Sequence, residues 1–285
     1  SSQEVLTEPF RDKLGQLKKF YLPISKMIAK EYLKKKETKV IGLTGGQGTG
    51  KSTISNILKI ILKEAYKLET VIFSIDDFYK TLKERKKISK KINKLFLTRG
   101  VPGTHDTKML LQCVNNLKND NFKSMTIPKF DKSIDDRCHS NSWYSIKKKP
   151  DIIIFEGWCV GAKSENNQTL KRTINSLEKA KDAKLIWRKY VNQQLNSKYK
   201  KLYNQLDSLL YLKAKNFSLL QEWRLKQERK LWLKNKNKKS SKHKIMSKGD
   251  VINFMQTYQR ITQNMFKFAP KYASIVLNLN NYHQI

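Results

Sequence analysis

The chain lacks the features that mark exported and membrane proteins. It has only three cysteines, an odd number with no C-x-x-C spacing, which argues against a disulfide framework and against the common zinc sites. Its apolar runs stay far short of the roughly 20 residues that a membrane helix needs. The first residues show no basic-then-apolar signal pattern. We therefore expect a cytoplasmic protein in a reducing compartment, with no membrane partner.

Acidic residues and arginines are also scarce. The chain carries 59 basic and 24 acidic residues, a net charge of +35, yet only nine of the basic residues are arginines. A charge of that size alone would favour a nucleic-acid or anionic-membrane partner. The lysines, however, are spread along the whole chain, and a joint excess of Lys, Asn and Ile is typical of AT-rich codon usage. We expect no dedicated nucleic-acid partner, only weak, salt-sensitive contacts with polyanions.

What the chain does contain is one glycine-rich stretch, Val-Ile-Gly-Leu-Thr-Gly-Gly-Gln-Gly-Thr-Gly-Lys-Ser-Thr at residues 40–53. It matches the spacing G-x-x-x-x-G-K-[ST] of a phosphate-binding loop. In such a loop, backbone N–H groups at a helix N-terminus cradle phosphates, the lysine reaches the β- and γ-phosphates, and the hydroxyl binds Mg²⁺. A β-branched run before the loop and apolar residues at helical spacing after it favour this function over a chance match. The predicted nucleotide-binding residues are Gly45, Gly46, Gln47, Gly48, Thr49, Gly50, Lys51, Ser52 and Thr53.

Two further predicted strands end in carboxylates. Residues 70–75 run into Asp76 and Asp77, and the apolar run that begins at residue 152 ends at Glu156. A strand, a helix and a strand in close succession predict a parallel pair with a right-handed crossover. Ligands of parallel sheets bind beyond the carboxyl ends of the strands. We therefore expect the three carboxylates to share one crevice with the loop, where Glu156 joins Ser52 as a Mg²⁺ ligand.

The whole pattern predicts an α/β fold: a three-layer α/β/α P-loop kinase domain with a mostly parallel central sheet and helical lid or insertions. Further strands are expected at residues 125–127, 209–212 and 273–279, and Asp106 is expected to cap the helix that follows it. The predicted parts of this single domain are N-terminal helices at 1–38, broken near Pro23, a nucleotide-binding core at 39–160, a helical insertion or lid at 161–248 with a solvated loop at 234–248, and a C-terminal helix and strand at 249–285.

Carboxylates beside a phosphate-binding loop are the set that phosphoryl transfer needs. The loop holds the triphosphate, a carboxylate helps to hold the metal, and another orients or deprotonates the acceptor hydroxyl. No N/T-K-x-D guanine-reading motif follows, which argues against a GTPase, and the chain has no second ATPase core, which argues against a helicase. These residues predict an ATP- and Mg²⁺-dependent small-molecule kinase.

Six strings then occur in the order of one known family. They are S-I-D-D-F-Y from Ser74, R-G-V-P-G-T-H-D from Arg99, P-K-F-D-K-S from Pro128, D-R from Asp136, I-F-E-G-W-C-V-G from Ile154 and W-R-x-x-Q-E from Trp223. Together, over about residues 39–279, they resemble the plant- and cyanobacterial-type D-glycerate 3-kinases. That family is a branch of the phosphoribulokinase, uridine kinase and pantothenate kinase superfamily. The resemblance implies transfer of a phosphoryl group from ATP to the 3-hydroxyl of D-glycerate, and a role in photorespiratory or salvage metabolism.

The resemblance also implies roles for individual residues. Asp76 is expected to be the general base, with Asp77 as the alternative base or as a support for the metal or the loop. Lys51 is expected to act on the phosphates. Because the arginine fork suits carboxylates and phosphates, and because arginine is rare here, Arg99 and Arg137 are expected to bind substrate and Arg224 to reach ATP from a lid. The other predicted substrate-binding residues are Asp77, Tyr79, His105, Lys129, Asp131 and Trp158.

One departure from the family and two rival functions remain. The family has a glycine-containing segment between D-K-S and D-R, where this chain has only Ile134 and Asp135, so the geometry around Arg137 is expected to differ. The nearest rival keeps the chemistry and changes the acceptor to pantothenate, a nucleoside or a sugar phosphate. The other rival is an ATP-binding protein whose partner is a polyanion. The sequence leaves the oligomeric state open.

Overall fold

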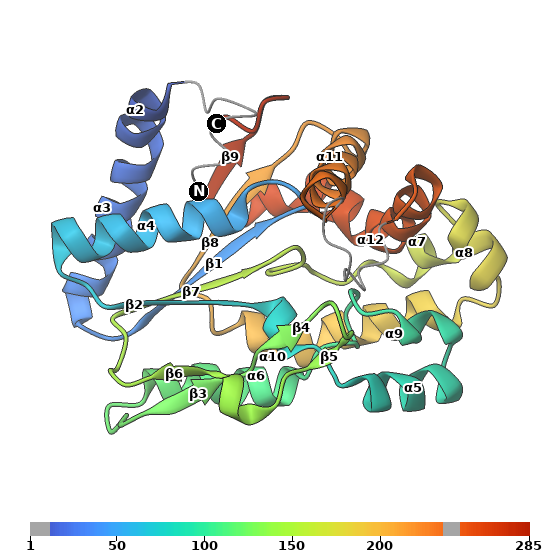
Figure 1. The fold of residues 1–285 in the computed structure, drawn as a ribbon, viewed down its shortest axis with the longest axis horizontal. Helices are drawn as coiled ribbons and strands as arrows, with labels where there is room; N and C mark the ends of the chain where they lie inside the picture. Colours follow the sequence, from blue (N-terminus) through green and yellow to red (C-terminus); the bar gives the residue numbers. More distant parts are fainter. Residues whose placement is uncertain (1–11, 236–245) are drawn as a thin grey trace.

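A sheet of five parallel strands, in the order β2-β7-β1-β8-β9, runs through the centre of the molecule (Figure 1). The computed structural model describes residues 12–235 and 246–285. The strands are β1 (Lys39–Gly45), β2 (Thr70–Ser74), β7 (Ile152–Gly157), β8 (Ser208–Lys213) and β9 (Ile275–Asn278). The prediction of a mostly parallel sheet is confirmed, and all five strands of this sheet are parallel. The strand predicted at 273–279 lies at its edge as β9.

The predicted pairing of the first two strands is wrong in one respect. β1 and β2 are parallel but not neighbours, because β7 lies between them and pairs with both. Ile153, for example, faces Val40 on one side and Val71 on the other. The side chains from Ile152 to Phe155 are fully buried, and an apolar run buried on both faces belongs inside a parallel sheet. That preference places β7 between the two strands that precede it in the chain.

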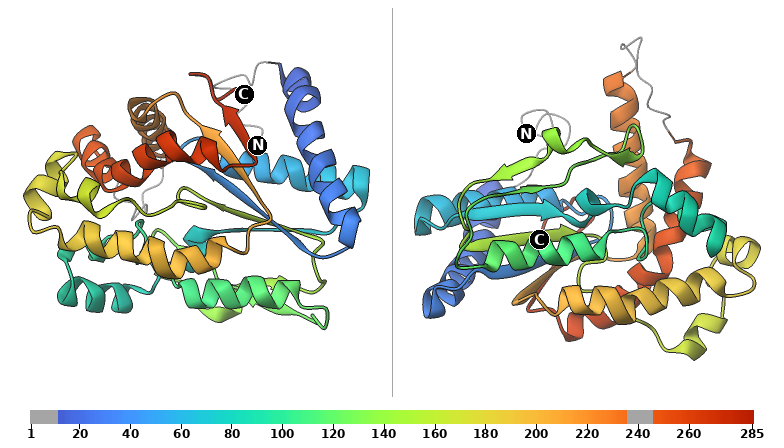
Figure 2. Two further views of the ribbon diagram at one scale, coloured as in Figure 1. Left: turned by 180° about the vertical axis from the view of Figure 1, so that it is seen from behind. Right: turned by 90° about the horizontal axis from the view of Figure 1, so that it is seen from below.

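Helices cover both faces of the sheet, which confirms the three-layer architecture (Figure 2). Side chains alternate along β7, so that Ile152 and Ile154 join one core while Ile153 and Phe155 join the other. The helices of the first core are α3 (Leu22–Lys35), α4 (Lys51–Tyr66) and α11 (Phe217–Asn235), and those of the second are α6 (Thr107–Lys118), α9 (Ile186–Gln194) and α10 (Lys200–Tyr203). The helix α12 (Lys248–Phe268) contributes side chains to both cores.

Shorter elements connect these layers. They are α2 (Lys13–Gln16), η1 (Leu17–Tyr21), η2 (Ile75–Phe78), α5 (Leu82–Lys91), η3 (Lys94–Leu97), β3 (Met125–Ile127), β4 (Phe130–Asp131), β5 (Asp136–Arg137), η4 (Ser140–Ser142), β6 (Tyr144–Ile146), α7 (Asn167–Lys171), α8 (Ser176–Lys181), η5 (Leu195–Tyr199) and η6 (Ala269–Lys271). The strand predicted at 125–127 exists as β3, but it pairs with β6 in a separate hairpin and not in the central sheet.

The break predicted near Pro23 is absent from the described N-terminal helices. Instead a π-helical segment, η1, passes directly into α3, and Pro23 lies in the first turn of α3. Proline is tolerated there because the missing N–H would have no partner within the new helix. The π-helical segment before it absorbs the change in hydrogen bonding.

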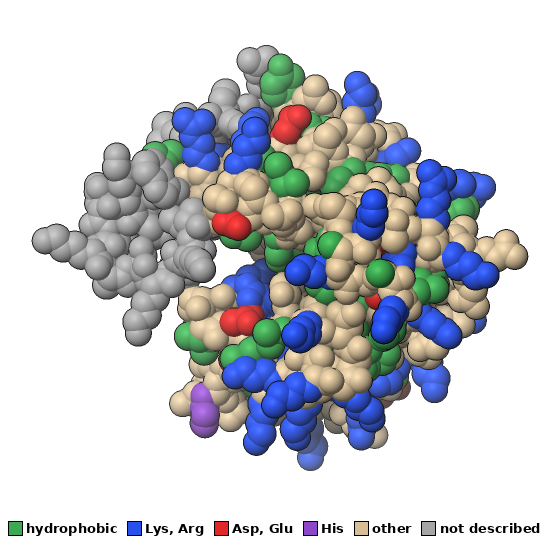
Figure 3. Space-filling model, turned by 90° about the vertical axis from the view of Figure 1, so that its right-hand side faces the viewer, with side chains coloured by type: hydrophobic (Ala, Val, Ile, Leu, Met, Phe, Trp, Pro, Cys, Tyr) green, Lys and Arg blue, Asp and Glu red, His purple; other side chains and the backbone are tan. Residues whose placement is uncertain are grey.

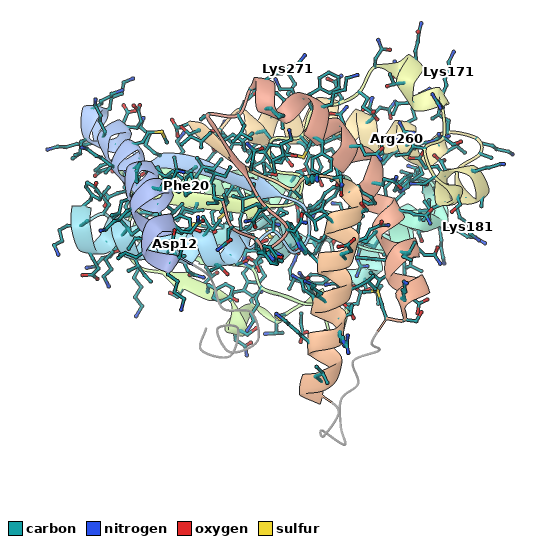
Figure 4. The ribbon with its side chains drawn as sticks, turned by 90° about the horizontal axis from the view of Figure 1, so that it is seen from above. Asp12, Phe20, Lys171, Lys181, Arg260 and Lys271 are labelled. Carbon is teal, nitrogen blue, oxygen red and sulfur yellow. The ribbon has the colours of Figure 1, made fainter. Side chains whose placement is uncertain are left out.

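Residues 161–203 pack into the same core as the sheet. Arg260 of α12 donates from Nε and Nη2 to the two carboxylate oxygens of Glu178, at 2.7 Å each. Arg188 lies 3.5 Å from Glu178 and donates from Nε to Asp182 at 2.8 Å. In Figure 4, Arg260 lies among the helices, whereas Lys171 lies at the rim.

Most of the loop predicted at 234–248 lies outside the described residues.

The surface reflects the composition of the chain. On the face drawn in Figure 3, Lys and Arg side chains are spread over the surface, and several of them gather along its lower edge. Within the described ranges, no helix combines the length and the apolar character needed to cross a membrane. The three cysteines are free, and Cys113 and Cys159 are buried.

Candidate active site

The phosphate-binding loop connects β1 to α4. Gly48 and Gly50 have φ angles of +81° and +83°, in the left-handed region that glycine adopts without strain. A Cβ at Gly48 would also lie 2.9 Å from the Cβ of Trp223, so the loop packs closely under α11. Gly50 is the N-cap of α4 and supplies no side-chain hydrogen bond to its first turn. The N–H groups of that turn therefore form a ready site for a phosphate.

Lys51 lies in the loop and is influenced by the charges of two carboxylates. Its ammonium donates to the carbonyl oxygens of Gly45 at 2.8 Å and of Gly46 at 3.0 Å. Burial lowers the pKa of Lys51, and the charges of Glu156 and then Asp76 oppose that change. Lys51 is thus within electrostatic reach of both carboxylates. The structure brings together the loop and the ends of β2 and β7, as the sequence pattern predicts.

Glu156, at the end of β7, lies against the first turns of α4. Its two carboxylate oxygens accept hydrogen bonds from the hydroxyl of Ser52 at 2.9 Å and from that of Ser55 at 3.1 Å. Mg²⁺ in phosphoryl-transfer sites is commonly held by one or two protein oxygens together with phosphate oxygens. Ser52 and Glu156 fit that arrangement. In the part of the chain that the structure describes, no group of three or more His, Cys, Asp and Glu side chains could hold a metal ion.

Asp76 is held by two side chains. The hydroxyl of Tyr79 donates to Oδ1 at 2.9 Å, and the ammonium of Lys132 donates to Oδ2 at 2.7 Å. Burial raises the pKa of Asp76, but the charge and hydrogen bond of Lys132, aided by Tyr79 and His105, outweigh it. The pKa is therefore below the ordinary value for aspartate, and Asp76 is ionised at neutral pH.

Asp77 has a structural partner. Its Oδ2 accepts a hydrogen bond from the backbone N–H of Ser74 at 2.9 Å, in a capping box that begins η2. Burial raises the pKa of Asp77 to about 6, the hydrogen bond from Ser74 lowers it, and the charge of Asp76 adds to the rise. The two adjacent carboxylates therefore differ in both contacts and basicity. The substrate role of Asp77 stays a prediction.

His105 is buried against Tyr79. The two rings stack with centroids 4.5 Å apart, and His105 Nδ1 lies 2.6 Å from the hydroxyl oxygen of Tyr199. Burial lowers the pKa of His105 to about 3, although the charge of Asp76 opposes the change. The imidazole is neutral at physiological pH.

Arg137 lies beside the same tyrosine. Its Nη2 donates to the carbonyl oxygen of Tyr79 at 2.9 Å and lies 3.6 Å from Asp106 Oδ2, while its Nε is buried without a hydrogen-bond partner among the described residues. Asp106 also caps α6 by accepting from the N–H of Met109 at 3.1 Å, which confirms the predicted cap. The Arg137 side chain is therefore anchored at one edge and has a donor left for a ligand.

The shortened segment before Arg137 closes a hairpin between β4 and β5. Asp135 takes a φ of +55°, in the left-handed region. Aspartate is among the residues that tolerate this region. Its carboxylate forms ion pairs with Arg99 and with Arg85, which is fully buried. The departure from the family is thus accommodated locally, and Arg99 is held at this turn.

Arg224 lies on α11, and Trp158 follows directly after β7. Arg224 pairs with Glu228 on the same helix, and its Nε is buried without a hydrogen-bond partner among the described residues. Trp158 donates to the carbonyl oxygen of Gly100 at 3.0 Å and packs edge-to-face against Tyr258. Trp158 is therefore held in place by loop and helix contacts, and its substrate role stays a prediction. The contact of Arg224 with ATP stays a prediction.

Lys129 and Asp131 lie farther out on the β4–β5 hairpin. The exposed Lys129 ammonium lies 5.8 Å from the centre of the Tyr144 ring. Asp131 accepts hydrogen bonds from the N–H of Ser133 at 2.7 Å and from its hydroxyl at 2.5 Å, which shapes the turn. Their predicted contacts with substrate are untested.

Sequence reasoning gave no role to three residues that contact the site. Ser55 lies three residues after Ser52, so helical spacing could have placed both hydroxyls on the face toward Glu156. Lys132 is part of the D-K-S string and could have been identified there. Tyr199 has no local signal, because it lies in a polar stretch far from every motif.

Comparison with known proteins identifies the family. Residues 40–188, just over half of the chain, match the phosphoribulokinase / uridine kinase family. The uncharacterized kinase mug58 of Schizosaccharomyces pombe is 32% identical over 259 residues, which cover 85% of this chain and 89% of that protein. The chloroplastic D-glycerate 3-kinase of Arabidopsis thaliana is 30% identical over 198 residues, 66% of this chain but only 41% of that protein.

A solved structure shares the whole architecture. It is a D-glycerate 3-kinase from Cryptococcus neoformans, with a TM-score of 0.75 at 24% identity, covering 93% of this chain and 97% of that one. Its likeness confirms the fold, and the sequence matches confirm the resemblance to this group of kinases. With a phosphate-binding loop, a lysine and converging carboxylates in place, the chain belongs to the phosphoribulokinase / uridine kinase family and is an ATP-using phosphotransferase.

Proposed function

We propose that this protein is an Mg²⁺-dependent kinase that transfers the γ-phosphoryl group of ATP to the 3-hydroxyl of D-glycerate, giving 3-phosphoglycerate. The observation that carries the proposal is the setting of Asp76, an ionised carboxylate fixed by Tyr79 and Lys132 within electrostatic reach of the loop lysine. The names of the Arabidopsis and Cryptococcus relatives support D-glycerate as the acceptor.

The nucleotide side of the site supplies the phosphate cradle. Backbone N–H groups of residues 45–53 bind the phosphates, and Lys51 exchanges its two carbonyl partners for phosphate oxygens. Ser52 and Glu156 would hold Mg²⁺, which would supply positive charge next to the phosphates. Arg224, from α11, contacts the nucleotide from the lid side.

The acceptor side supplies the base and the substrate clamp. Asp76 accepts the proton of the attacking hydroxyl, and its two oxygens are already oriented by Tyr79 and Lys132. The guanidinium groups of Arg137 and Arg99 bind the carboxylate of the hydroxy acid, because a planar fork matches two carboxylate oxygens. The other predicted substrate contacts are Asp77, Tyr79, His105, Lys129, Asp131 and Trp158.

The test is a coupled assay of ADP release with Mg-ATP against D-glycerate, pantothenate, uridine and ribulose 5-phosphate. Turnover with D-glycerate alone, lost in Asp76→Asn, is expected. The matched control is Asp120→Asn, which removes an exposed carboxylate that pairs only at the surface with Lys149. Turnover with another acceptor would support the proposed kinase activity but would rule out D-glycerate as the acceptor. If the folded protein bound ATP but used no acceptor, the polyanion-binding alternative would gain support.

A further inference from the structure

A buried chain of hydrogen bonds ends at His105. The hydroxyl of Tyr199 lies 2.6 Å from His105 Nδ1, and the backbone N–H of Gly103 donates to the same hydroxyl oxygen at 3.1 Å. Both side chains are almost completely buried, with 0% exposure for Tyr199 and 1% for His105. The polar groups in this chain must therefore satisfy one another or a bound ligand.

The direction of the bond between the two side chains follows from the donors present. The tyrosine hydroxyl has one hydrogen to give, and among the described residues His105 Nδ1 is the acceptor found within hydrogen-bond distance of it. If Nδ1 carried a proton instead, the buried hydroxyl hydrogen would lose that acceptor, which is unfavourable. The tyrosine is therefore the donor, Nδ1 is the acceptor, and the single proton of the neutral imidazole lies on Nε2.

That Nε2–H group is buried and has no hydrogen-bond partner among the described residues. Its ring stacks on Tyr79, which in turn donates to Asp76. A buried donor without a partner is rare, and its ring stacks on the tyrosine that holds the proposed base, so a ligand oxygen is the natural acceptor.

The backbone that carries Tyr199 is unusual too. Tyr199 is the last residue of η5, a π-helical segment between α9 and α10. Single turns of π-helix within α-helices occur frequently at functional sites, because they redirect a side chain that regular helix would point elsewhere. The element that breaks the regular pattern is the one that brings the hydroxyl to His105.

We infer that Tyr199 is a positioning residue: its hydroxyl holds His105 in the Nε2–H tautomer, so that this N–H donates to an oxygen of the bound hydroxy acid. The inference deepens the proposed function and rests on it for the identity of the acceptor. The tautomer itself is a property of the protein without substrate.

The first test is therefore a ¹⁵N NMR spectrum of the histidine side chains in the substrate-free protein, with His105 identified by its loss in His105→Gln. A protonated Nε2 with an unprotonated Nδ1 is expected, mixed tautomers are expected in Tyr199→Phe, and no change is expected in Tyr203→Phe. Tyr203 is a matched control, because its buried hydroxyl donates to the carbonyl oxygen of Cys159 and not to the histidine. A proton on Nδ1 of His105 in the wild-type protein would overturn the inference.

The second test replaces His105 by residues that keep a polar group near only one of its two ring nitrogens. Glutamine at 105 places an amide N–H near the position of Nε2, whereas asparagine places its polar atoms near Nδ1, where they can still accept from Tyr199. We expect His105→Gln to keep the acceptor KM within a few-fold, and His105→Asn to raise it about ten- to hundredfold with an unchanged KM for ATP.

Thermal unfolding should give the opposite order, with His105→Asn more stable than His105→Gln, since only asparagine keeps the partner of Tyr199. A merely structural histidine would make the KM values follow the stabilities, and that result would overturn the inference. If the protein used an acceptor other than D-glycerate, the proposed function would fail while the NMR result and the KM order for that acceptor still decided the role of Tyr199.

Discussion

The two sides of the candidate site are built differently. The phosphate side is one loop, residues 45–53, joined by Glu156, and the groups proposed to bind phosphate there are mostly backbone N–H groups. The acceptor side is assembled from side chains of distant segments. Lys132 is 56 residues from Asp76, and Tyr199 is 94 residues from His105. One side is made by a strand–turn–helix, and the other by tertiary packing.

This difference has consequences for tolerance to mutation. A backbone cradle loses function when its conformation is disturbed. A side chain at Gly48 would disturb it, because Gly48 has a φ of +81° and an added Cβ would collide with Trp223. An assembled site loses function one group at a time. Mutations on the two sides should therefore have different effects on nucleotide binding and on acceptor turnover when the two are measured independently.

The largest difference between the loss of kcat and the loss of ATP affinity is expected for Asp76→Asn. Removal of a general base costs about 10²- to 10⁴-fold in kcat, whereas the phosphate cradle is untouched, so the Kd for ATP should stay close to that of the wild type. Lys51→Ala is the comparison on the other side, and it should weaken ATP binding as well as turnover. Stopped-flow or calorimetric ATP binding beside kcat distinguishes the two. Equal losses of ATP affinity in both variants would contradict the division.

A smaller effect on activity is expected for Ser52 and Ser55, the two serines whose hydroxyls donate to Glu156. Ser52→Ala removes the hydroxyl proposed as a ligand, and Ser55→Ala removes only a hydrogen bond that orients Glu156. Loss of groups at or next to a metal typically costs about 10- to 100-fold in affinity, with Ser52→Ala expected at the upper end and Ser55→Ala at the lower. Titration of activity with Mg²⁺ measures both. The reverse order would move the ligand role from Ser52 to Ser55.

The same division explains what the sequence could predict. The loop, the strand that ends at Glu156 and the helix after Asp106 each depend on residues close together in the chain, so spacing alone identified them. The central place of β7 depends on which strands it pairs with. Its apolar run Ile152–Phe155 indicated full burial but did not specify its neighbours.

The acceptor side resisted prediction for a physical reason. Tyr199 reaches His105 from η5, which is π-helical, and helix propensities do not predict where a π-helical turn occurs. Asp135 adopts a left-handed conformation in the shortened segment and forms ion pairs with Arg85 and Arg99. Motif strings could name Arg99, Arg137 and His105 as candidates, but their partners come from tertiary packing.

Lys132 should control the pH dependence of turnover. Burial raises the pKa of Asp76, but the charge and hydrogen bond of Lys132, together with His105 and Tyr79, outweigh it and hold the pKa below the ordinary value. In Lys132→Met the pKa of Asp76 rises, so the acid limb of kcat/KM moves to higher pH. Lys132→Arg keeps the charge and is the matched control. An unchanged acid limb in Lys132→Met would mean that a group other than Asp76 titrates.

The smallest effect on turnover is expected at the neighbouring carboxylate. Asp77 has a pKa of about 6 in the folded protein against an ordinary value of 3.8, so between these two values the folded state holds more protons than the unfolded state. The free energy of unfolding contributed by this group therefore falls as pH rises from 3.8 to 6 and stays low above it.

Asp77→Asn removes that charge, and its side-chain oxygen can still accept from the N–H of Ser74. We expect it to raise the free energy of unfolding by about 1–3 kcal/mol at pH 7.5 and by little at pH 4, with kcat changed less than tenfold. Urea unfolding at the two pH values measures the first effect, and the coupled assay measures the second. A loss of kcat as large as that of Asp76→Asn would instead make Asp77 the base.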